Sequence, residues 1–348
     1  MPAAAEPEAV LAWVESPFQF LGALEAHSSG LLGERLVVLP RQNVEPLART
    51  IADLERLGLP PGVSVLSPGP APHRFGGPLA IGDAFSGAVH RLLMQSSPSS
   101  LVLLDDGRST RRVMDALVMP AVPLIRPHIL PSPPRALLAR MALRKLHRMA
   151  GRGRLRVITA LNLPDGVIDA ATQAGIQIDK HDFAWLRGLP GDAVPATDTV
   201  VLGTSLVAND LITAEPYLKW VCSIAKEGPV TYRAHRREDA RTLGPLSRCP
   251  GVLIETGQVP VEVSLRKMTA RHNVLTLPTT AVSTLRLITP EARIREFAVP
   301  DCWWLPQVPM AARRHLVPDR GQPHPIDLEA GSGVPKFPMT LKPGSVRH

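Results

Sequence analysis

Short apolar runs alternate with helical patterns along the first half of the chain. Apolar residues recur three or four positions apart over about 17–28, 43–57, 81–96 and 135–150, as they do in amphipathic helices. Between and around these segments lie short apolar runs typical of buried strands, at residues 11–16, 35–40, 63–66, 100–106 and 156–161. Strands that alternate with helices predict a parallel sheet covered on both faces, which is a doubly wound α/β unit.

The same alternation restarts after residue 196. Strand-like runs lie at 199–203, 230–235, 252–256 and 273–277, and a helical pattern lies near 214–227. The intervening segment 188–198 holds two prolines and two glycines without periodicity, which is typical of a linker. We therefore expect an N-terminal α/β lobe over 1–190, a C-terminal α/β lobe over 196–299, and a proline-rich, partly irregular segment over 300–348.

Bulk properties narrow the setting of the protein. Single cores stop growing at about 250–300 residues, so a chain of 348 residues suits two domains. The chain lacks the roughly 18-residue apolar run of a membrane span, and its acidic start around Glu6 and Glu8 lacks the features of a secretory signal. We expect a cytoplasmic protein, with its three cysteines, Cys222, Cys249 and Cys302, as reduced thiols.

The formal net charge of +8 predicts an anionic partner. Nucleic acid, an anionic membrane surface and a phosphorylated small molecule all satisfy this charge. Aromatic residues make up only 4% of the chain, which leaves few platforms for stacked bases. Nucleic acid is therefore not expected among the partners.

Two adjacent carboxylates follow one of the predicted buried strands. Asp105 and Asp106 come after the run LVLL and precede Gly107, at the strand end where open α/β sheets bind ligands. One of the two carboxylates can serve there as a general base. The alternative is a tight Asp-Gly turn in which an aspartate caps the next helix.

A basic cluster follows the strand at 230–235. Arg233, Arg236 and Arg237 surround His235. Arginine forks bind phosphate oxygens, and a histidine can donate a proton to a leaving phosphate. The alternative is a solvated helix start, with acidic residues in its first turn.

Small and hydroxyl residues follow two further strands of the second half. Gly203-Thr204-Ser205 comes after the run TVVL, and a Ser/Thr-rich stretch at 276–285 crosses a strand-to-helix junction. Hydroxyls and backbone N–H groups at a helix start bind anions, although Ser and Thr are also preferred helix caps. No complete dinucleotide or P-loop fingerprint is present. We expect no metal site, because the paired aspartates lack a third ligand nearby.

The order of these features resembles the bacterial sialyltransferases. That order is SPFQ at 16–19, DDG at 105–107, the Gly203 loop, an Arg-x-His at 233–235, PVE at 260–262 and the hydroxyl cluster at 279–284. The group includes lipooligosaccharide sialyltransferases and capsular polysialyltransferases, which share a D/E-D/E-G motif, a His-Pro motif and a Ser/Thr motif. The resemblance covers roughly residues 11–290 and implies a GT-B fold, in which two doubly wound Rossmann-like lobes face a central cleft.

The resemblance also implies an activity. It is the inverting, metal-independent transfer of sialic acid or a related nonulosonate from a CMP-sugar to a glycan or glycolipid acceptor, in capsule or lipooligosaccharide synthesis. No cofactor is implied, because the CMP-sugar is a co-substrate.

The resemblance assigns roles to individual residues. Asp105 becomes the base that deprotonates the acceptor, and His235 becomes the acid or hydrogen-bond donor at the CMP phosphate. The remaining assignments place Ser283, Thr284, Arg233 and Arg236 at the phosphate, Gly203 and Glu262 at the nucleoside, and Ser16, Gln19 and Asp106 on the acceptor side.

One departure from the motifs leaves the donor open. Arg236 stands where the His-Pro motif has proline, so the turn that presents the histidine lacks its usual restraint. A transferase that uses CMP-Kdo or another nucleotide sugar stays as an alternative, as does a non-enzymatic polyanion-binding protein.

A basic stretch lies at the end of the first half. Residues 135–156 contain no acid, and Arg140, Arg144 and Arg148 recur at four-residue spacing. The apolar residues Leu137, Leu138, Met141 and Met149 lie broadly on another face. Such a helix suits peripheral contact with the inner face of a membrane. The alternative is a solvated surface helix that packs its leucines on the N-terminal lobe.

Overall fold

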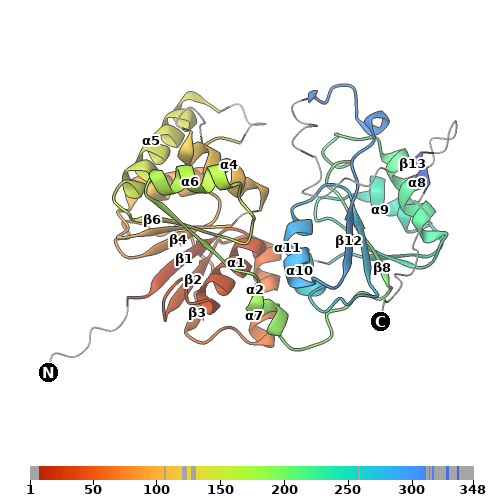
Figure 1. Ribbon diagram of the computed structural model, residues 1–348, viewed down its shortest axis with the longest axis horizontal. Coiled ribbons are helices and arrows are strands. Elements are labelled where there is room, and N and C mark those ends of the chain that lie inside the picture. The colour runs from red at the N-terminus through yellow and green to blue at the C-terminus, as the bar shows by residue number, and fades with distance from the viewer. Residues whose placement is uncertain are drawn as a thin grey trace, which may run out of the picture. The chain divides into compact units, whose positions relative to one another are not determined.

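The computed structural model describes residues 8–105, 107–119, 124–126, 131–257 and 259–310, together with 313, 316, 327–328 and 335–336. The chain forms two compact units (Figure 1). One comprises Met1–Gly191 with Gln258–Val263, and the other comprises Asp192–Gly257 with Ser264–His348. The first division falls inside the proline- and glycine-containing segment 188–198.

The N-terminal unit is built on a seven-stranded parallel sheet in the order β3-β2-β1-β4-β5-β6-β7. Its strands are β1 (Val10–Val14), β2 (Leu36–Pro40), β3 (Val63–Val65), β4 (Leu79–Ile81), β5 (Leu101–Leu104), β6 (Leu155–Thr159) and β7 (Ile176–Lys180). Its helices are α1 (Pro17–Ser28), α2 (Glu45–Leu57), α3 (Gly87–Gln95), α4 (Arg108–Val118), α5 (Pro133–Ala150), α6 (Asp165–Gln173) and α7 (Ala184–Gly188).

The helices of this unit cover the two faces of the sheet as separate groups. Helices α3, α4, α5 and α6 pack with one another, and α1 packs with α2 and α7. The order of the strands explains this grouping, because right-handed crossovers that run outward in opposite directions from the centre of a sheet lie on opposite faces.

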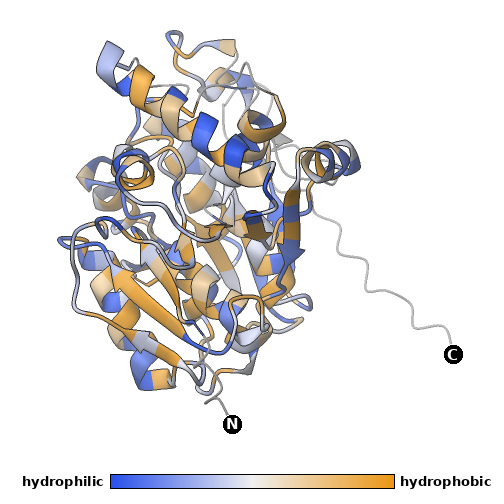
Figure 2. Cartoon of the chain, turned by 90° about the vertical axis from the view of Figure 1, so that its left-hand side faces the viewer, coloured by the Kyte–Doolittle hydropathy of each residue, from blue (hydrophilic) through white to orange (hydrophobic). Residues whose placement is uncertain are grey.

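Burial of the central strands explains their near-continuous apolar sequence. All four residues of β5 are buried, and Trp13 of β1 is 2% exposed within the core that extends to α3, α4 and α5. Several strands of this unit are largely orange in Figure 2, while the helices around them alternate orange and blue. Parallel strands covered on both faces have this composition.

The C-terminal unit is built on a five-stranded parallel sheet in the order β10-β9-β8-β11-β12. Its strands are β8 (Thr199–Leu202), β9 (Val230–Arg233), β10 (Val252–Glu255), β11 (Asn273–Thr276) and β12 (Arg293–Glu296), with a separate antiparallel pair β13 (Asp327–Leu328) and β14 (Pro335–Lys336). The helices after residue 191 are α8 (Ala214–Ala225), α9 (Ala240–Leu246), α10 (Val261–Ser264), α11 (Ala281–Ile288) and the 3-10 helix η1 (Asp301–Trp303). The prediction of two doubly wound α/β units is confirmed by the two sheets.

Two features of the C-terminal unit differ from the sequence-based expectation. Trp303 and Trp304, in the stretch expected to be irregular, are buried in the core with Trp220 and Phe297. Cys222 and Cys249 form a disulfide between residues whose Cα atoms are 6.0 Å apart, so the expectation of three reduced thiols is wrong for this pair. Cys302 is free and exposed. Among the described residues, no helix has the length and apolar character needed to cross a bilayer.

Candidate functional site

The N-terminal sheet has its topological switch point between β1 and β4. From β1 the chain passes through β2 to β3 on one side, and β4 then pairs with the other side of β1. The helices that follow β1 and β4 leave toward opposite faces, and ligands of open α/β sheets bind at the carboxyl ends of the strands at such a switch point. Glu15 follows β1, and Asp83 lies two residues after β4.

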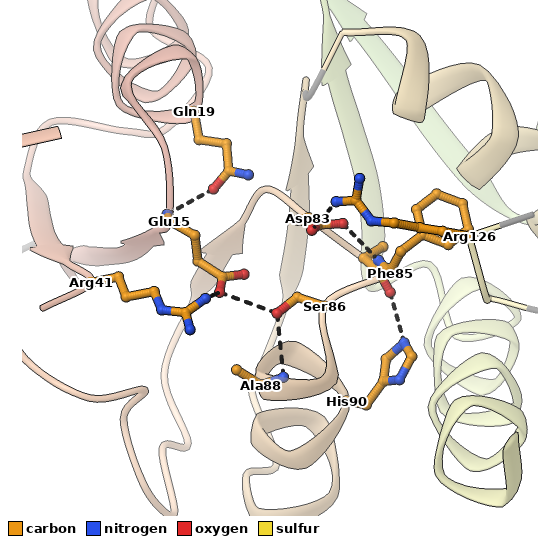
Figure 3. Close-up of polar contacts among 10 residues, drawn as sticks. Glu15, Gln19, Arg41, Asp83, Phe85, Ser86, Ala88, His90 and Arg126 are labelled. Carbon is orange, nitrogen blue, oxygen red and sulfur yellow. Dashed lines mark hydrogen bonds and ion pairs between the residues drawn. The ribbon is translucent and has the colours of Figure 1, made fainter. Parts of the chain in front are cut away.

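Glu15 is the centre of a polar cluster at this edge (Figure 3). Its Oε1 accepts a bond of 2.5 Å from Arg41, which follows β2, and one of 3.1 Å from the hydroxyl of Ser86. The Glu15 side chain is only 7% exposed, and its Oε2 has no hydrogen-bond partner among the described residues. Burial raises the pKa of Glu15. The hydrogen bond from Ser86 lowers this pKa, and the nearby Asp83 carboxylate raises it further.

The second carboxylate of the cluster is held by an ion pair and a turn. Oδ2 of Asp83 accepts a hydrogen bond of 2.5 Å from Arg126, and Oδ1 accepts one of 3.0 Å from the backbone N–H of Phe85. His90 fixes the same loop, because its Nε2 lies 2.8 Å from the carbonyl oxygen of Ala84. Two carboxylates therefore lie at one strand edge, and each has its own cation.

Ser16 and Gln19, predicted on the acceptor side, form the cap of α1. The Ser16 hydroxyl accepts 3.3 Å from the N–H of Gln19, and the Gln19 side chain reaches back to accept 2.8 Å from the N–H of Glu15. This reciprocal pattern is close to a capping box. A Cβ at Gly82 would overlap the Gln19 side chain, so Gly82 lets the cap pack on the end of β4. SPFQ thus has a structural role beside Glu15.

Asp105 lies 1% exposed at the end of β5, with both carboxylate oxygens bonded. Oδ1 accepts 2.8 Å from the N–H of Gly107 and 2.7 Å from the Thr110 hydroxyl. Oδ2 accepts 2.7 Å from the Thr159 hydroxyl and 3.1 Å from the N–H of Ala160. Burial raises the pKa of Asp105, while these four bonds lower it.

This geometry is that of a carboxylate which ties β5, α4 and β6 together. A general base must reach the hydroxyl that it deprotonates, and the four bonds of Asp105 are all made inside the protein. The catalytic role of Asp105 stays a prediction. Asp106 lies outside the described residues.

The C-terminal sheet has its switch point between β8 and β11. Gly203 follows β8, and its N–H donates 2.8 Å to the carbonyl of Arg233. A Cβ at Gly203 would clash with the Glu238 carboxylate and lie 2.8 Å from the backbone nitrogen of His235. Gly203 thus makes room for the protein loop that carries His235. In the sequence-based expectation, a nucleoside instead lies next to Gly203.

His235 lies on a loop that is anchored to the core. Its backbone N–H donates 2.7 Å to Glu238 Oε2, and Glu238 Oε1 accepts 2.5 Å from the Tyr232 hydroxyl, which meets the Tyr217 hydroxyl at 2.7 Å. Burial raises the pKa of Glu238 to about 7. Tyr217 and Tyr232 are fully buried.

The imidazole of His235 is neutral near pH 7. Burial, together with Arg236 and Arg237, lowers its pKa to about 4. Nδ1 accepts 3.2 Å from the N–H of Arg237, so this pattern assigns the proton to Nε2. His235 can therefore donate a hydrogen bond from Nε2 without being a cation.

The two predicted phosphate arginines differ. Arg233, at the end of β9, donates 2.6 Å to Glu255 Oε2, and its side chain is 11% exposed. Its guanidinium occupies the space where Gly257 has no side chain. Arg236 is exposed. Arg233 is thus committed to an ion pair, whereas Arg236 is accessible to an anion.

The hydroxyl cluster forms the start of α11. Ser283 lies in the first turn and is partly buried, while Thr284 is buried and donates 3.0 Å to the carbonyl of Ala281. The N–H of Thr279 donates 3.1 Å to Glu296, at the end of β12. Ser283 and the N-terminus of α11 thus lie beyond β11, the strand that neighbours β8.

Glu262, predicted at the ribose, lies outside the C-terminal unit. It is buried in α10, within the segment Gln258–Val263 that groups with the N-terminal unit. Its contact with a nucleoside stays a prediction.

The solvent face of α5 combines cations with exposed apolar side chains. Leu137 is 59% exposed and Met141 is 44% exposed, one helical turn apart. Arg140, Arg144 and Arg148 are exposed on the same helix. Leu143 and Leu146 pack in the core on the opposite side. The leucines of α5 are therefore divided between the core and the surface.

No protein-family description matches this sequence, and no curated protein matches it. Similar solved structures include a UDP-glucosyltransferase from Polygonum tinctorium, 9% identical over 85% of this chain and 81% of that chain, with a TM-score of 0.44. The E. coli heptosyltransferase WaaC is 13% identical over 84% of this chain and 89% of that one, at 0.40. A UDP-GlcNAc 2-epimerase from Methanocaldococcus jannaschii is 8% identical over 84% of its own length and 83% of this chain, at 0.42.

The strand orders themselves define the class of the protein as an α/β chain of two Rossmann-like units, which is the architecture named by the predicted GT-B fold.

The sequence-based prediction missed the cluster around Glu15. Glu15 is the second-last residue of the run 11–16 that predicts a strand, and a carboxylate at the end of a predicted strand is the signal that singled out Asp105. The stretch that became β4 is only three residues long and was not predicted, so Asp83 had no strand end to follow.

Proposed function

We propose that this protein is a glycosyltransferase whose C-terminal unit binds a CMP-activated sugar at the β9-β8-β11 edge. The observation that carries the proposal is the set of groups at three neighbouring strand ends. His235 follows β9, the Gly203-Thr204-Ser205 loop follows β8, and the start of α11 follows β11. Ligands of open α/β sheets bind at such an edge.

The groups at this edge suit a phosphate. The N-terminus of α11 carries a partial positive charge, and exposed arginines such as Arg236 add full charges. The neutral His235 offers a hydrogen bond from Nε2 to an oxygen of the leaving phosphate. Such donors, fixed before the reaction, stabilise charge as it develops on the leaving group.

The donor sugar in this proposal is sialic acid or a related nonulosonate, and the acceptor is a glycan or glycolipid of the cell surface. Support for this choice comes from the order of the sequence motifs, which resembles that of the bacterial sialyltransferases. The acceptor hydroxyl attacks the anomeric carbon opposite the leaving CMP, so the configuration inverts.

A nucleotide panel tests the donor base. Ligands stabilise the folded state by about 2.7 kcal/mol at one hundred times their Kd, so melting temperatures with CMP, UDP and GDP separate the candidates. We expect CMP to raise the melting temperature most. Stabilisation by UDP and not by CMP would overturn the cytidine assignment.

Product analysis tests the reaction. The protein is incubated with CMP-sialic acid and with lactose- or sialic-acid-terminated acceptors, and the products are identified by mass spectrometry. We expect His235→Gln to lose most of the transfer rate, while the matched change of the exposed His73→Gln keeps it. Full transfer by His235→Gln would remove His235 from the mechanism.

We also propose that α5 rests on an anionic membrane surface. Basic side chains beside exposed apolar ones suit the headgroup region of a bilayer. A transferase held there would be close to a lipid-linked acceptor.

A further inference from the structure

His235 is held by Glu238 on both of its backbone polar groups. The N–H of His235 donates 2.7 Å to Glu238 Oε2, and the carbonyl oxygen of His235 accepts 2.8 Å from the backbone N–H of Glu238. The second bond closes a four-residue β-turn, with Arg236 and Arg237 at its centre. The conformation of this turn therefore depends on Glu238 through its main chain and through its side chain.

The same turn orients the imidazole of His235. Nδ1 accepts 3.2 Å from the backbone N–H of Arg237, the third residue of the turn. This contact leaves Nε2 as the ring nitrogen that can meet a ligand, and His235 is only half-buried. A change in the backbone of the turn would thus move the hydrogen bond that Nε2 offers.

The Glu238 carboxylate is fixed from two further directions. Its Oε1 accepts 2.5 Å from the hydroxyl of Tyr232, which bonds to the buried Tyr217 at 2.7 Å. The backbone N–H of Thr204, in the loop after β8, also donates to this carboxylate. One side chain thus joins the loops that follow the neighbouring strands β8 and β9 to each other and to the core of the C-terminal unit.

We propose that Glu238 is a positioning residue of the donor site, whose carboxylate gives the His235 turn the restraint that a proline would give it. The inference rests on the transferase function proposed above. Arg236 occupies the second position of the turn, which favours proline because the ring presets φ near −65°. Among the described residues, the backbone N–H of Arg236 has no hydrogen-bond partner, so a proline at this position would break no bond.

The first test compares Glu238→Ala with the conservative Glu238→Gln. The amide oxygen of Glu238→Gln can accept from His235 and Thr204, and its NH₂ group can donate to the Tyr232 hydroxyl, so the turn should persist. We expect Glu238→Ala to lose about 10–10²-fold in kcat for transfer from CMP-sialic acid, the cost of a misplaced group, with a smaller change in KM. Glu238→Gln should keep kcat within about twofold of the wild type.

The second test asks whether a proline can replace the carboxylate. Arg236→Pro and Arg236→Ala remove the same cation, so they form a matched pair. In the chain with Glu238 intact the two variants should be equally active, since the turn is already held. In the Glu238→Ala background the Arg236→Pro variant should be the more active by about two- to fivefold, the size of the effect of a compatible proline on a backbone conformation.

The third test follows the imidazole without any substrate. Burial lowers the pKa of His235 to about 4 from its ordinary value of 6.5, and a turn that opens would expose the ring and raise this pKa again. NMR titration, with His235→Gln to assign the signal, should show the rise in Glu238→Ala and not in Glu238→Gln. Urea denaturation checks that Glu238→Ala is folded. If it is not, Tyr232→Phe, which removes only the hydroxyl on Oε1, replaces it with smaller effects in the same direction.

Three results would overturn the inference. They are a folded Glu238→Ala variant with the wild-type kcat, one in which the pKa of His235 stays at about 4, and an equal ratio of the Arg236→Pro and Arg236→Ala activities in both backgrounds. If the wild type neither transfers sugar nor is stabilised by any nucleotide, the proposed function fails. The NMR titration still decides in that case whether Glu238 holds the imidazole.

Discussion

Removal of the Asp105 carboxylate should destabilise the N-terminal unit. Four donors point at this carboxylate, and two of them are the hydroxyls of Thr110 and Thr159. A hydroxyl can rotate toward another acceptor. The backbone N–H groups of Gly107 and Ala160 cannot, so Asp105→Ala leaves both of them buried without a partner.

The magnitude follows from these two groups. A buried donor without a partner costs about 1–3 kcal/mol, so two of them lower the free energy of unfolding by about 2–6 kcal/mol. Asp105→Asn should cost less, about 1–3 kcal/mol, because the amide oxygen serves one pair of donors and only the Ala160 N–H is left facing an NH₂ group. The neutral amide also avoids the cost of burying a charge, which is the cost that raises the pKa of Asp105.

Urea denaturation followed by circular dichroism measures the free energy of unfolding, and amide hydrogen exchange at Ala160 reports the local effect. The control is Asp169→Asn, an exposed aspartate on α6 of the same unit. The reasoning is refuted if Asp105→Ala unfolds within about 0.5 kcal/mol of the wild type, since surface substitutions fall in that range. The carboxylate would then have no structural role.

Three further predictions concern stability and surface. Burial raises the pKa of Glu25 to about 7, so the protonated carboxyl contributes stability below pH 4.5 that is lost as the pH rises through 7. The free energy of unfolding of the wild type, measured by urea titration, should therefore decline between pH 5 and pH 8, and in Glu25→Gln this decline should be smaller by about 2–3 kcal/mol. Burial lowers the pKa of His181 to about 4, and neither ring nitrogen has a hydrogen-bond partner among the described residues. The free energy of unfolding of the wild type should therefore fall as the pH drops from 6.5 toward 4. In His181→Phe this loss should be smaller by about 2 kcal/mol at pH 5. The protein should sediment with anionic vesicles at low salt and not with neutral ones, and the double change Leu137→Ser, Met141→Ser should weaken this binding by about tenfold or more; absence of sedimentation at low salt would remove the membrane proposal.

Local chemistry made much of the fold predictable. The predicted helix at 17–28 is α1, since Ser16 caps it and Pro17 begins it. The predicted strand at 199–203 is β8, with its buried apolar residues. Strands β4, β7 and β12 escaped prediction for different reasons. β4 is short and its last residue falls in the helical pattern at 81–96, while β7 and β12 lie at sheet edges and carry charged residues that mask the apolar pattern.

The candidate site was less predictable, because its groups meet through strand order. Asp105 has the appearance of a base in sequence, yet its partners Thr159 and Ala160 lie 54 and 55 positions away and only the pairing of β5 with β6 brings them close. Glu15 and Ser86 are 71 positions apart and meet because β1 pairs with β4. Side-chain chemistry can be read from sequence, but the number of hydrogen bonds that a carboxylate makes cannot.

The buried hydrogen-bonded chain from Tyr217 through Tyr232 and Glu238 to the backbone of His235 has a consequence for the strength of binding. A loop that must be ordered when its ligand arrives reduces affinity by the conformational entropy that it loses. Here three hydrogen bonds hold the loop before any ligand is present. The imidazole thus lies on a preorganised loop, so binding does not lose free energy to the ordering of the loop's backbone.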